Sequence, residues 1–189
     1  MTLLLILLAV LPTIFMIVFI YYKDSYEKEP AGLLVSLFAL GMAGTIPAVA
    51  YETAGDAFIG LFFYKNSGIY NLISAFLGVA LVEEGVKFIA LYFRTWKNPN
   101  YNYKFDGIVY AVLVSLGFAT VENILYVLEV GLSVAIARAL LSVPSHAIDA
   151  VYMLFYYLYA KYYDTVGIVR RRNKNLRMAV IVPVLLHGC

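Results

Sequence analysis

The chain has 189 residues, of which 63% are hydrophobic and only 14% are charged. A soluble domain is about half apolar and about one quarter charged, so one water-soluble core of this size cannot bury the excess, and lipid must be the solvent for most of the surface. A net charge of +2 gives no indication of a nucleic-acid partner, and the single cysteine, Cys189, excludes an intramolecular disulfide and a cysteine-based metal cluster.

Six segments are apolar and, at about 20 residues each, suited to cross the hydrocarbon layer as helices. In chain order they are residues 2–22, 31–50, 69–93, 107–129, 131–160 and 178–189, the last being cut short by the end of the chain. The first segment lacks the basic leader and the cleavage site of a secretory signal, so we interpret it as a retained helix. The sequence therefore predicts an all-α, multi-pass transmembrane helix bundle that forms one membrane domain over residues 1–189.

The connections between these segments differ in charge. Those at 23–30, 94–106 and 161–177 share one side of the membrane and hold 11 Lys and Arg residues, whereas the opposite side has only Lys65. Because cytoplasmic loops are enriched in basic residues, this difference predicts that the N-terminus lies outside the cell. The basic run at 170–172 could also be a patch for lipid headgroups or nucleic acid, but a topology anchor is the simpler interpretation.

Ionisable side chains also occur inside the predicted helices: Glu83, Glu84, Lys87, Glu122, Arg138, His146, Asp149 and His187. A charge at the middle of a transmembrane helix costs about 2.5–3.5 kcal/mol. Such groups must therefore face one another or a wet cavity. Their occurrence on four different helices favours a shared functional centre over unrelated packing residues.

The third segment brings two carboxylates to one ammonium group. Glu83 and Glu84 precede Lys87 by four and three residues, so both acids lie on its face of the helix. Two adjacent carboxylates in a low dielectric differ in how readily they hold a proton, as general acid–base chemistry requires. A structural ion pair that locks helix packing is the alternative interpretation of this motif.

The fourth and last segments add further polar groups. Asn123 lies beside Glu122, and Gly117 permits the close approach of another helix. His187 lies ten residues into the last segment, at a depth compatible with the other buried groups.

The fifth segment carries a polar stripe at spacings of four, four and three: Arg138, Ser142, His146 and Asp149. Pro144 removes one helical hydrogen bond and is expected to kink the helix just before His146. Taken singly, His146 could be a hydrogen-bonded packing residue, and Arg138 could extend toward the membrane surface.

These groups suit hydrolysis, although the motifs of serine hydrolases and of HExxH metalloproteases do not occur. Glu or His could activate a water, with hydrogen-bond donors holding the oxyanion. Two His and one or two Glu could equally bind a zinc ion with water in its open position. The alternatives are a non-catalytic scaffold and a proton relay in a transporter, although the inverted repeats typical of transporters are not found.

At these residues the chain resembles the PrsW family, polytopic bacterial membrane proteases that make the first cut in an anti-sigma factor. The matching stretches are EEGVK at 83–87, FDGIVYAVLVSLGFATVENILY at 105–126, RALLSVPSHA at 138–147 and VPVLLHG at 182–188, together with YYKDSYEKEP at 21–30. More distantly, the EExxK motif and the late histidine are similar to CAAX-type Glu intramembrane proteases. In the family an aromatic-Asp element and further membrane sequence follow the late His-Gly, whereas this chain ends at Cys189.

The resemblance implies an integral membrane endopeptidase of the bacterial cell membrane that uses a water activated by Glu and His. Its implied substrate is a single-pass membrane protein, an anti-sigma factor of envelope-stress signalling. The lipid bilayer is the other expected partner, and no nucleic acid is expected. A proton-coupled membrane transporter that uses the same buried groups is the alternative.

The resemblance also implies roles for individual residues. Five are expected to be catalytic: Glu83, Glu84, Glu122, His146 and His187. Three would support them: Lys87, Asn123 and Arg138. Glu83 or Glu84 would be the base, Glu122 and His146 would position the water or hold a metal, His187 would stabilise the oxyanion or act as a ligand, and Lys87 would orient the carboxylates. The cofactor is either none or a divalent metal such as zinc, held by Glu83, Glu122, His146 and His187.

Overall fold

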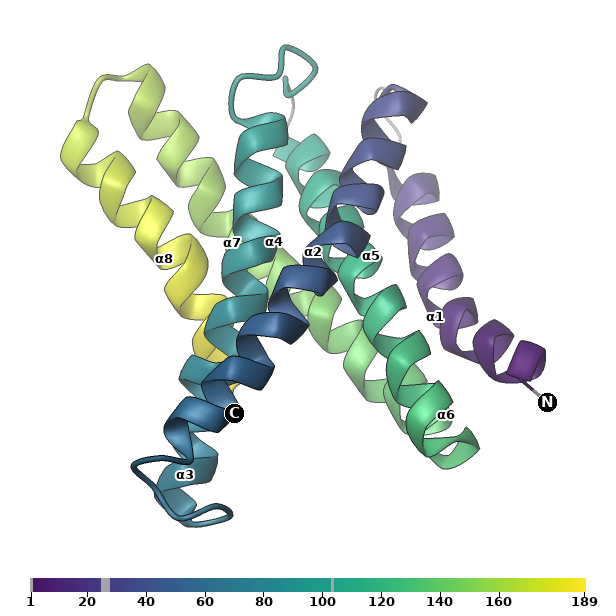
Figure 1. Cartoon of the computed structure of the whole chain (residues 1–189). Helices are drawn as coiled ribbons and strands as arrows, with labels where there is room; N and C mark the ends of the chain where they lie inside the picture. The colour runs from purple at the N-terminus through teal and green to yellow at the C-terminus, as the bar shows by residue number, and fades with distance from the viewer. Residues whose placement is uncertain (1, 25–27, 103) are drawn as a thin grey trace.

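The computed structural model describes residues 2–24, 28–102 and 104–189, which form a helical bundle (Figure 1). In chain order its elements are α1 (Thr2–Lys23), α2 (Ala31–Ile59), α3 (Gly68–Ile73), η1 (Ser74–Ala80), α4 (Leu81–Thr95), α5 (Lys104–Val130), α6 (Leu132–Ala137), η2 (Arg138–Ser142), α7 (Val143–Thr165) and α8 (Val169–His187). The elements η1 and η2 are π-helical and continue directly into α4 and α7. No strand occurs among the described residues.

Four helical stretches in the described part of the chain are long and apolar enough to cross a membrane: Thr2–Lys23, Ala31–Ile59, Phe105–Val130 and Arg138–Thr165. The prediction of an all-α, multi-pass membrane protein is therefore confirmed. The other two predicted spans, 69–93 and 178–189, are also helical, but they are not among these four. Charged residues within α4 and α8 account for the difference.

Two helices extend farthest beyond their predicted limits. α2 continues nine residues past position 50, to Ile59, and α8 begins at Val169, nine residues before position 178. The predicted limits are wrong because charged side chains were expected to lie in loops. Glu, Lys and Arg are good helix formers, so a helix can continue through them once its apolar part ends.

α5 lies at the centre of the bundle, in contact with α1, α2, α4 and α7 (Figure 1). In its apolar stretch of 18 residues, 72% of the residues are buried inside the protein, against 11% in α1. α1 is therefore a peripheral helix that presents most of its apolar side chains to lipid, whereas α5 presents its side chains to the other helices.

Two glycines allow α2 and α5 to come into backbone contact. A Cβ atom on Gly41 would lie 2.9 Å from the carbonyl carbon of Val114, and one on Gly117 would lie 3.0 Å from the carbonyl carbon of Phe38. The close helix approach predicted at Gly117 is confirmed. Small residues at such crossings are the usual device of membrane helix packing.

Aromatic side chains join α4 to α7. The ring of Tyr157 lies edge-on to Trp96, with 5.3 Å between ring centroids, and its hydroxyl is 2.8 Å from the hydroxyl of Thr95. Tyr101 stacks on the same ring at 6.2 Å. These contacts fix the relative position of the two helices that carry Lys87 and His146.

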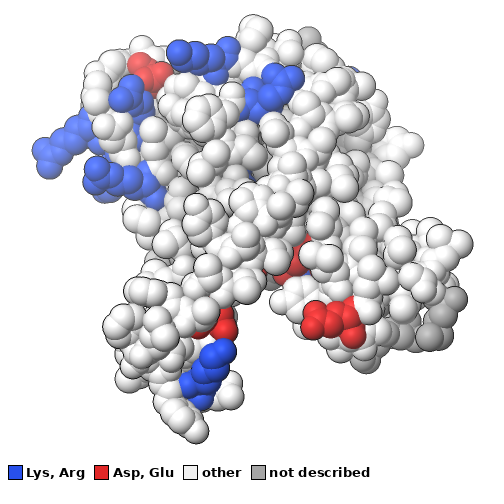
Figure 2. Space-filling model, viewed as in Figure 1, with Lys and Arg blue, Asp and Glu red and all other residues white. Residues whose placement is uncertain are grey.

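The basic side chains gather at one end of the molecule. Figure 2 shows Lys and Arg concentrated at the end where α7 joins α8, and the opposite end includes Lys65, in the connection from α2 to α3. The basic end is the one that the positive-inside rule assigns to the cytoplasm. The start of α1 lies at the other end (Figure 1), in agreement with the predicted orientation.

Candidate active site

α4 presents two buried carboxylates and a buried ammonium on one face. Glu83, Glu84 and Lys87 are 3%, 0% and 2% exposed. The Lys87 Nζ atom donates to Glu83 Oε2 at 3.0 Å and to Glu84 Oε1 at 2.7 Å. The helical spacing predicted this pairing, since residues three and four apart on a helix are neighbours.

His146 of α7 joins this cluster through both of its ring nitrogens. Its Nδ1 atom lies 3.0 Å from Lys87 Nζ, and its Nε2 atom lies 2.8 Å from Glu122 Oε2. An ammonium group can only donate, so Nδ1 is the acceptor in the first contact. Nε2 therefore carries the ring proton and donates it to Glu122, which fixes both the tautomer and the ring orientation.

Glu122 of α5 lies behind His146, with Arg138 of η2 on its other side. The Arg138 Nη2 atom is 2.7 Å from Glu122 Oε2, and Arg138 Nε donates to Asn123 Oδ1 at 2.7 Å. The guanidinium also lies over the ring of Tyr126, 4.2 Å from its centroid. The three residues predicted to support the site, Lys87, Asn123 and Arg138, are thus all brought to it by the fold.

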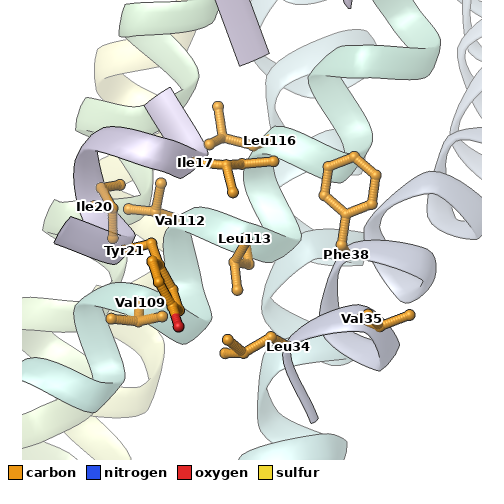
Figure 3. Close-up of a pocket in the computed structure, with 10 residues that line it drawn as sticks. All are labelled: Ile17, Ile20, Tyr21, Leu34, Val35, Phe38, Val109, Val112, Leu113 and Leu116. Carbon is orange, nitrogen blue, oxygen red and sulfur yellow. The ribbon is translucent and has the colours of Figure 1, made fainter. Parts of the chain in front are cut away.

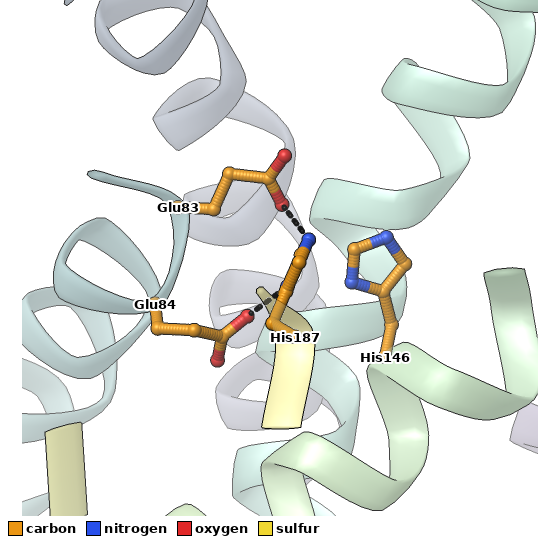
Figure 4. Close-up of side chains that lie close together, drawn as sticks. All are labelled: Glu83, Glu84, His146 and His187. Atoms are coloured by element: carbon orange, nitrogen blue, oxygen red, sulfur yellow. Dashed lines mark hydrogen bonds and ion pairs between the residues drawn. The ribbon is translucent and has the colours of Figure 1, made fainter. Parts of the chain in front are cut away.

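His187 of α8 completes the cluster. Its Nδ1 atom is 3.0 Å from Glu84 Oε1, and its Nε2 atom is 3.8 Å from Glu83 Oε2. Figure 4 shows the His187 ring between the two carboxylates and His146. The His187 side chain is 19% exposed, so the cluster reaches the surface at this residue.

The cluster has the composition of a site for a divalent cation. Glu83, Glu84, His146 and His187 each offer one ligand atom, and these atoms all lie within 4.8 Å of one another. Carboxylate oxygens and imidazole nitrogens are ligands of catalytic zinc ions. In addition, Glu84 Oε2 is buried and has no hydrogen-bond partner in the described part of the chain. The residues present therefore fit a divalent ion.

This group differs in one member from the predicted set of metal ligands. It contains Glu84, whereas the sequence suggested Glu122. Glu122 instead accepts a hydrogen bond from His146 and pairs with Arg138. Carboxylates in that position commonly orient a ligating histidine rather than bind the metal themselves.

Two further carboxylates lie at the site. Asp149 was recognised only as part of the polar stripe, and its Oδ2 atom is 3.7 Å from His187 Nδ1. Glu52 was assigned to a connection, but it lies in α2, partly buried, and interacts electrostatically with Glu83, Glu122, Lys87 and His187. The sequence of α2 indicated that Glu52 faces the interior. Buried residues follow one another at the helical spacings of four, four and three, and Glu52 continues the series four residues later: Leu37, Gly41, Thr45, Ala48 and Glu52.

The space-filling view shows a hollow at the end of the molecule opposite the basic residues (Figure 2). It lies between the projection formed by α3 and the end of α2 and the projection formed by α5 and α6, and acidic side chains line it. Glu122, which is 15% exposed, and His187 are the partly exposed members of the cluster.

An apolar pocket between α1, α2 and α5 is a separate feature (Figure 3). Its volume is about 220 Å³, and Ile17, Leu34, Phe38 and Leu116 are among the residues that line it. None of its lining residues, all of them described, carries a carboxylate, an imidazole or an amine. It is therefore no candidate for the catalytic centre.

A helical membrane bundle with Glu and His side chains buried within 4.8 Å of one another has the side chains that a membrane-embedded hydrolase requires. Residues 29–189 match the model of a family described as PrsW family intramembrane metalloprotease. The chain therefore belongs to the PrsW family and is a membrane-embedded protease, and a transporter function is not supported.

Relatives from several bacteria agree with this assignment. Protease PrsW of Geobacillus kaustophilus is 38% identical over 181 residues, which cover 95% of this chain and 74% of the relative. The proteins of the same name from Bacillus subtilis and Clostridioides difficile are each 35% identical, over 94% and 96% of this chain and 76% and 75% of the relatives. No solved structure matches the chain.

Proposed function

We propose that this chain is an endopeptidase of the bacterial cell membrane that cleaves a single-pass membrane protein through attack of water on a peptide carbonyl. In this proposal residues 1–189 act as one membrane domain, and the substrate is an anti-sigma factor. The convergence of two carboxylates and two imidazoles within 4.8 Å, inside a membrane bundle, carries the proposal. The resemblance of the EEGVK and late His-Gly motifs to the PrsW pattern supports the substrate class.

Glu84 is the base in this proposal. In this structure its Oε1 atom contacts Lys87 and His187, whereas its buried Oε2 atom has no hydrogen-bond partner among the described residues, so Oε2 is the oxygen that would take a proton from a water. The water oxygen bonds to the carbonyl carbon as its proton passes to Glu84. When the C–N bond breaks, Glu84 returns this proton to the departing amine, so the carboxylate is regenerated.

Of the four residues that fit a divalent ion such as zinc, Glu83, His146 and His187 would hold it, and Glu84 would lie beside it as the base. When bound, such an ion polarises the peptide carbonyl and lowers the pKa of water. Glu122 keeps the Nδ1 atom of His146 directed at the centre of the cluster by accepting the proton of Nε2. Arg138 holds Glu122 in turn, and Asn123 holds Arg138.

Replacing Glu84 by Gln tests the assignment of the base. Gln keeps the size of the side chain but cannot take the proton, so cleavage should fall by about 10²–10⁴-fold. The measurement is the rate at which a tagged single-pass anti-sigma factor is converted to its shorter fragment, when both proteins are reconstituted in lipid vesicles.

The matched control is Glu129→Gln, which neutralises an exposed carboxylate on α5 outside the cluster and should leave the rate unchanged. Wild-type cleavage by folded Glu84→Gln protein would show that Glu84 is not the base. Cleavage of other single-pass proteins, with the anti-sigma factor left intact, would overturn the proposed substrate alone.

A further inference from the structure

The ammonium group of Lys87 lies among the groups that fit a divalent ion. Its Nζ atom contacts Glu83 Oε2 at 3.0 Å, Glu84 Oε1 at 2.7 Å and His146 Nδ1 at 3.0 Å. The same atom lies over the ring of Phe118, 4.4 Å from the ring centroid. Three of the four candidate metal-binding residues thus already contact one positive charge, the ammonium group of Lys87.

His146 cannot serve this ammonium and a metal ion at the same time. Its Nε2 atom is committed to Glu122, so it can bind a metal only through Nδ1. That nitrogen has a single lone pair, which accepts a hydrogen bond from Lys87. A metal bound at Nδ1 must therefore replace Lys87 at this atom.

Electrostatic repulsion also prevents Lys87 and a metal ion from occupying the site together. Two carboxylates balance one divalent ion, and in a buried site a nearby ammonium group would repel that ion strongly. The carboxylates also need a cation before any metal is bound, since two adjacent, unpaired negative charges inside a membrane bundle are strongly unfavourable. Lys87 supplies that positive charge from within the chain.

We propose that Lys87 is a placeholder for the metal: its ammonium group holds Glu83, Glu84 and His146 together until a divalent ion displaces it, so that the two cations compete for one site. This inference rests on the metal-binding part of the proposed function. It gives Lys87 a role beyond orientation of the carboxylates, because it makes this residue a determinant of metal affinity.

Competition is tested by zinc binding to purified protein in detergent. Lys87→Met removes the charge and keeps much of the length of the side chain, whereas Lys87→Arg keeps a cation at the site. We expect the Met variant to bind zinc at least about tenfold more tightly than wild type, a difference of about 1.4 kcal/mol. The Arg variant should not gain affinity. Equal or weaker zinc binding by Lys87→Met would overturn the proposal.

Thermal unfolding gives a second readout that does not depend on activity. The Met variant without zinc should melt below wild type, and zinc should raise its melting temperature more than it raises that of wild type. If the Met variant folds only when prepared with zinc, removal of the metal by a chelator should unfold it and leave wild type folded. Equal resistance of both proteins to the chelator would contradict the placeholder role.

Failure of the metal site itself would look different. Zinc binding that survives both His146→Ala and His187→Ala would show that the ion binds elsewhere, and no zinc binding by any of the variants would reject the metal site together with the placeholder. If wild type binds zinc through these histidines and Lys87→Met does not gain affinity, the metal site stands and the placeholder proposal alone is wrong.

Discussion

At the scale of single residues, hydrogen bonds and an ion pair determine the direction in which each side chain of the cluster points. His146 uses Nδ1 toward the centre and Nε2 toward Glu122, and Glu122 in turn pairs with Arg138. These contacts form a row that leads from Lys87, through His146 and Glu122, to the partly exposed Arg138. In the proposed function, residues farther along the row would act by orienting those nearer the centre.

Glu122→Ala should therefore weaken catalysis without abolishing it. Loss of a carboxylate that orients a ligating histidine typically costs about 10–100-fold in activity or metal affinity. The measurement is the rate of fragment production in vesicles, set beside the rate for Glu84→Gln. A loss as large as that of Glu84→Gln would mean that Glu122 takes part directly in the chemistry.

Only part of this residue-scale arrangement could be predicted from the sequence. The meeting of Glu83 and Glu84 with Lys87 follows from helix geometry alone, because the three residues belong to one helix. The contact between Glu122 and His146 joins side chains on different helices, 24 positions apart. Spacing along one chain cannot decide such a pairing, so the sequence could not separate Glu122 from the candidate metal ligands.

At the scale of helices, hydropathy predicted the apolar segments but not where all of them end. The charged residues near the end of α2 resemble a loop when each is considered singly, yet α2 continues through them and brings Glu52 to the site. The π-helical turns η1 and η2 were also not predicted. They directly precede the helices that carry Glu83 and His146, and such turns are frequent at functional sites.

The glycine contacts between α2 and α5 can be tested by adding one methyl group. Gly41→Ala places a Cβ atom against the backbone of Val114, so the helices must move apart, and overpacking of this kind costs about 1–3 kcal/mol. The melting temperature of the purified protein should fall, and cleavage should fall with it, because α5 carries Glu122.

Gly32→Ala is the matched control in the same helix, since nothing lies within 4 Å of a Cβ atom at that position. It should leave the melting temperature close to that of wild type. An equal decrease for both variants would show that the contact between α2 and α5 is not the cause, because Ala favours a helix more than Gly does and helix propensity alone would not destabilise α2.

At the scale of the whole molecule, the unequal distribution of basic residues makes the orientation testable. In a Cys189→Ser background, a cysteine at Lys65 should react with a membrane-impermeant maleimide added to intact cells, and a cysteine at Lys174 should not. Both side chains are exposed, so burial does not limit the reaction. Both positions should react once the membrane is made permeable, and the reverse pattern in intact cells would overturn the orientation.

The hollow in Figure 2 bears on the fate of the products. Because it opens away from the basic end of the bundle, the proposed single-pass substrate would enter from the outer face of the bilayer and be cut on the outer side of its membrane helix. One product would be a water-soluble outer piece that diffuses away. The other would be a stump that keeps its membrane helix and its entire inner portion, so this single cut would shorten the substrate without freeing anything into the cell interior.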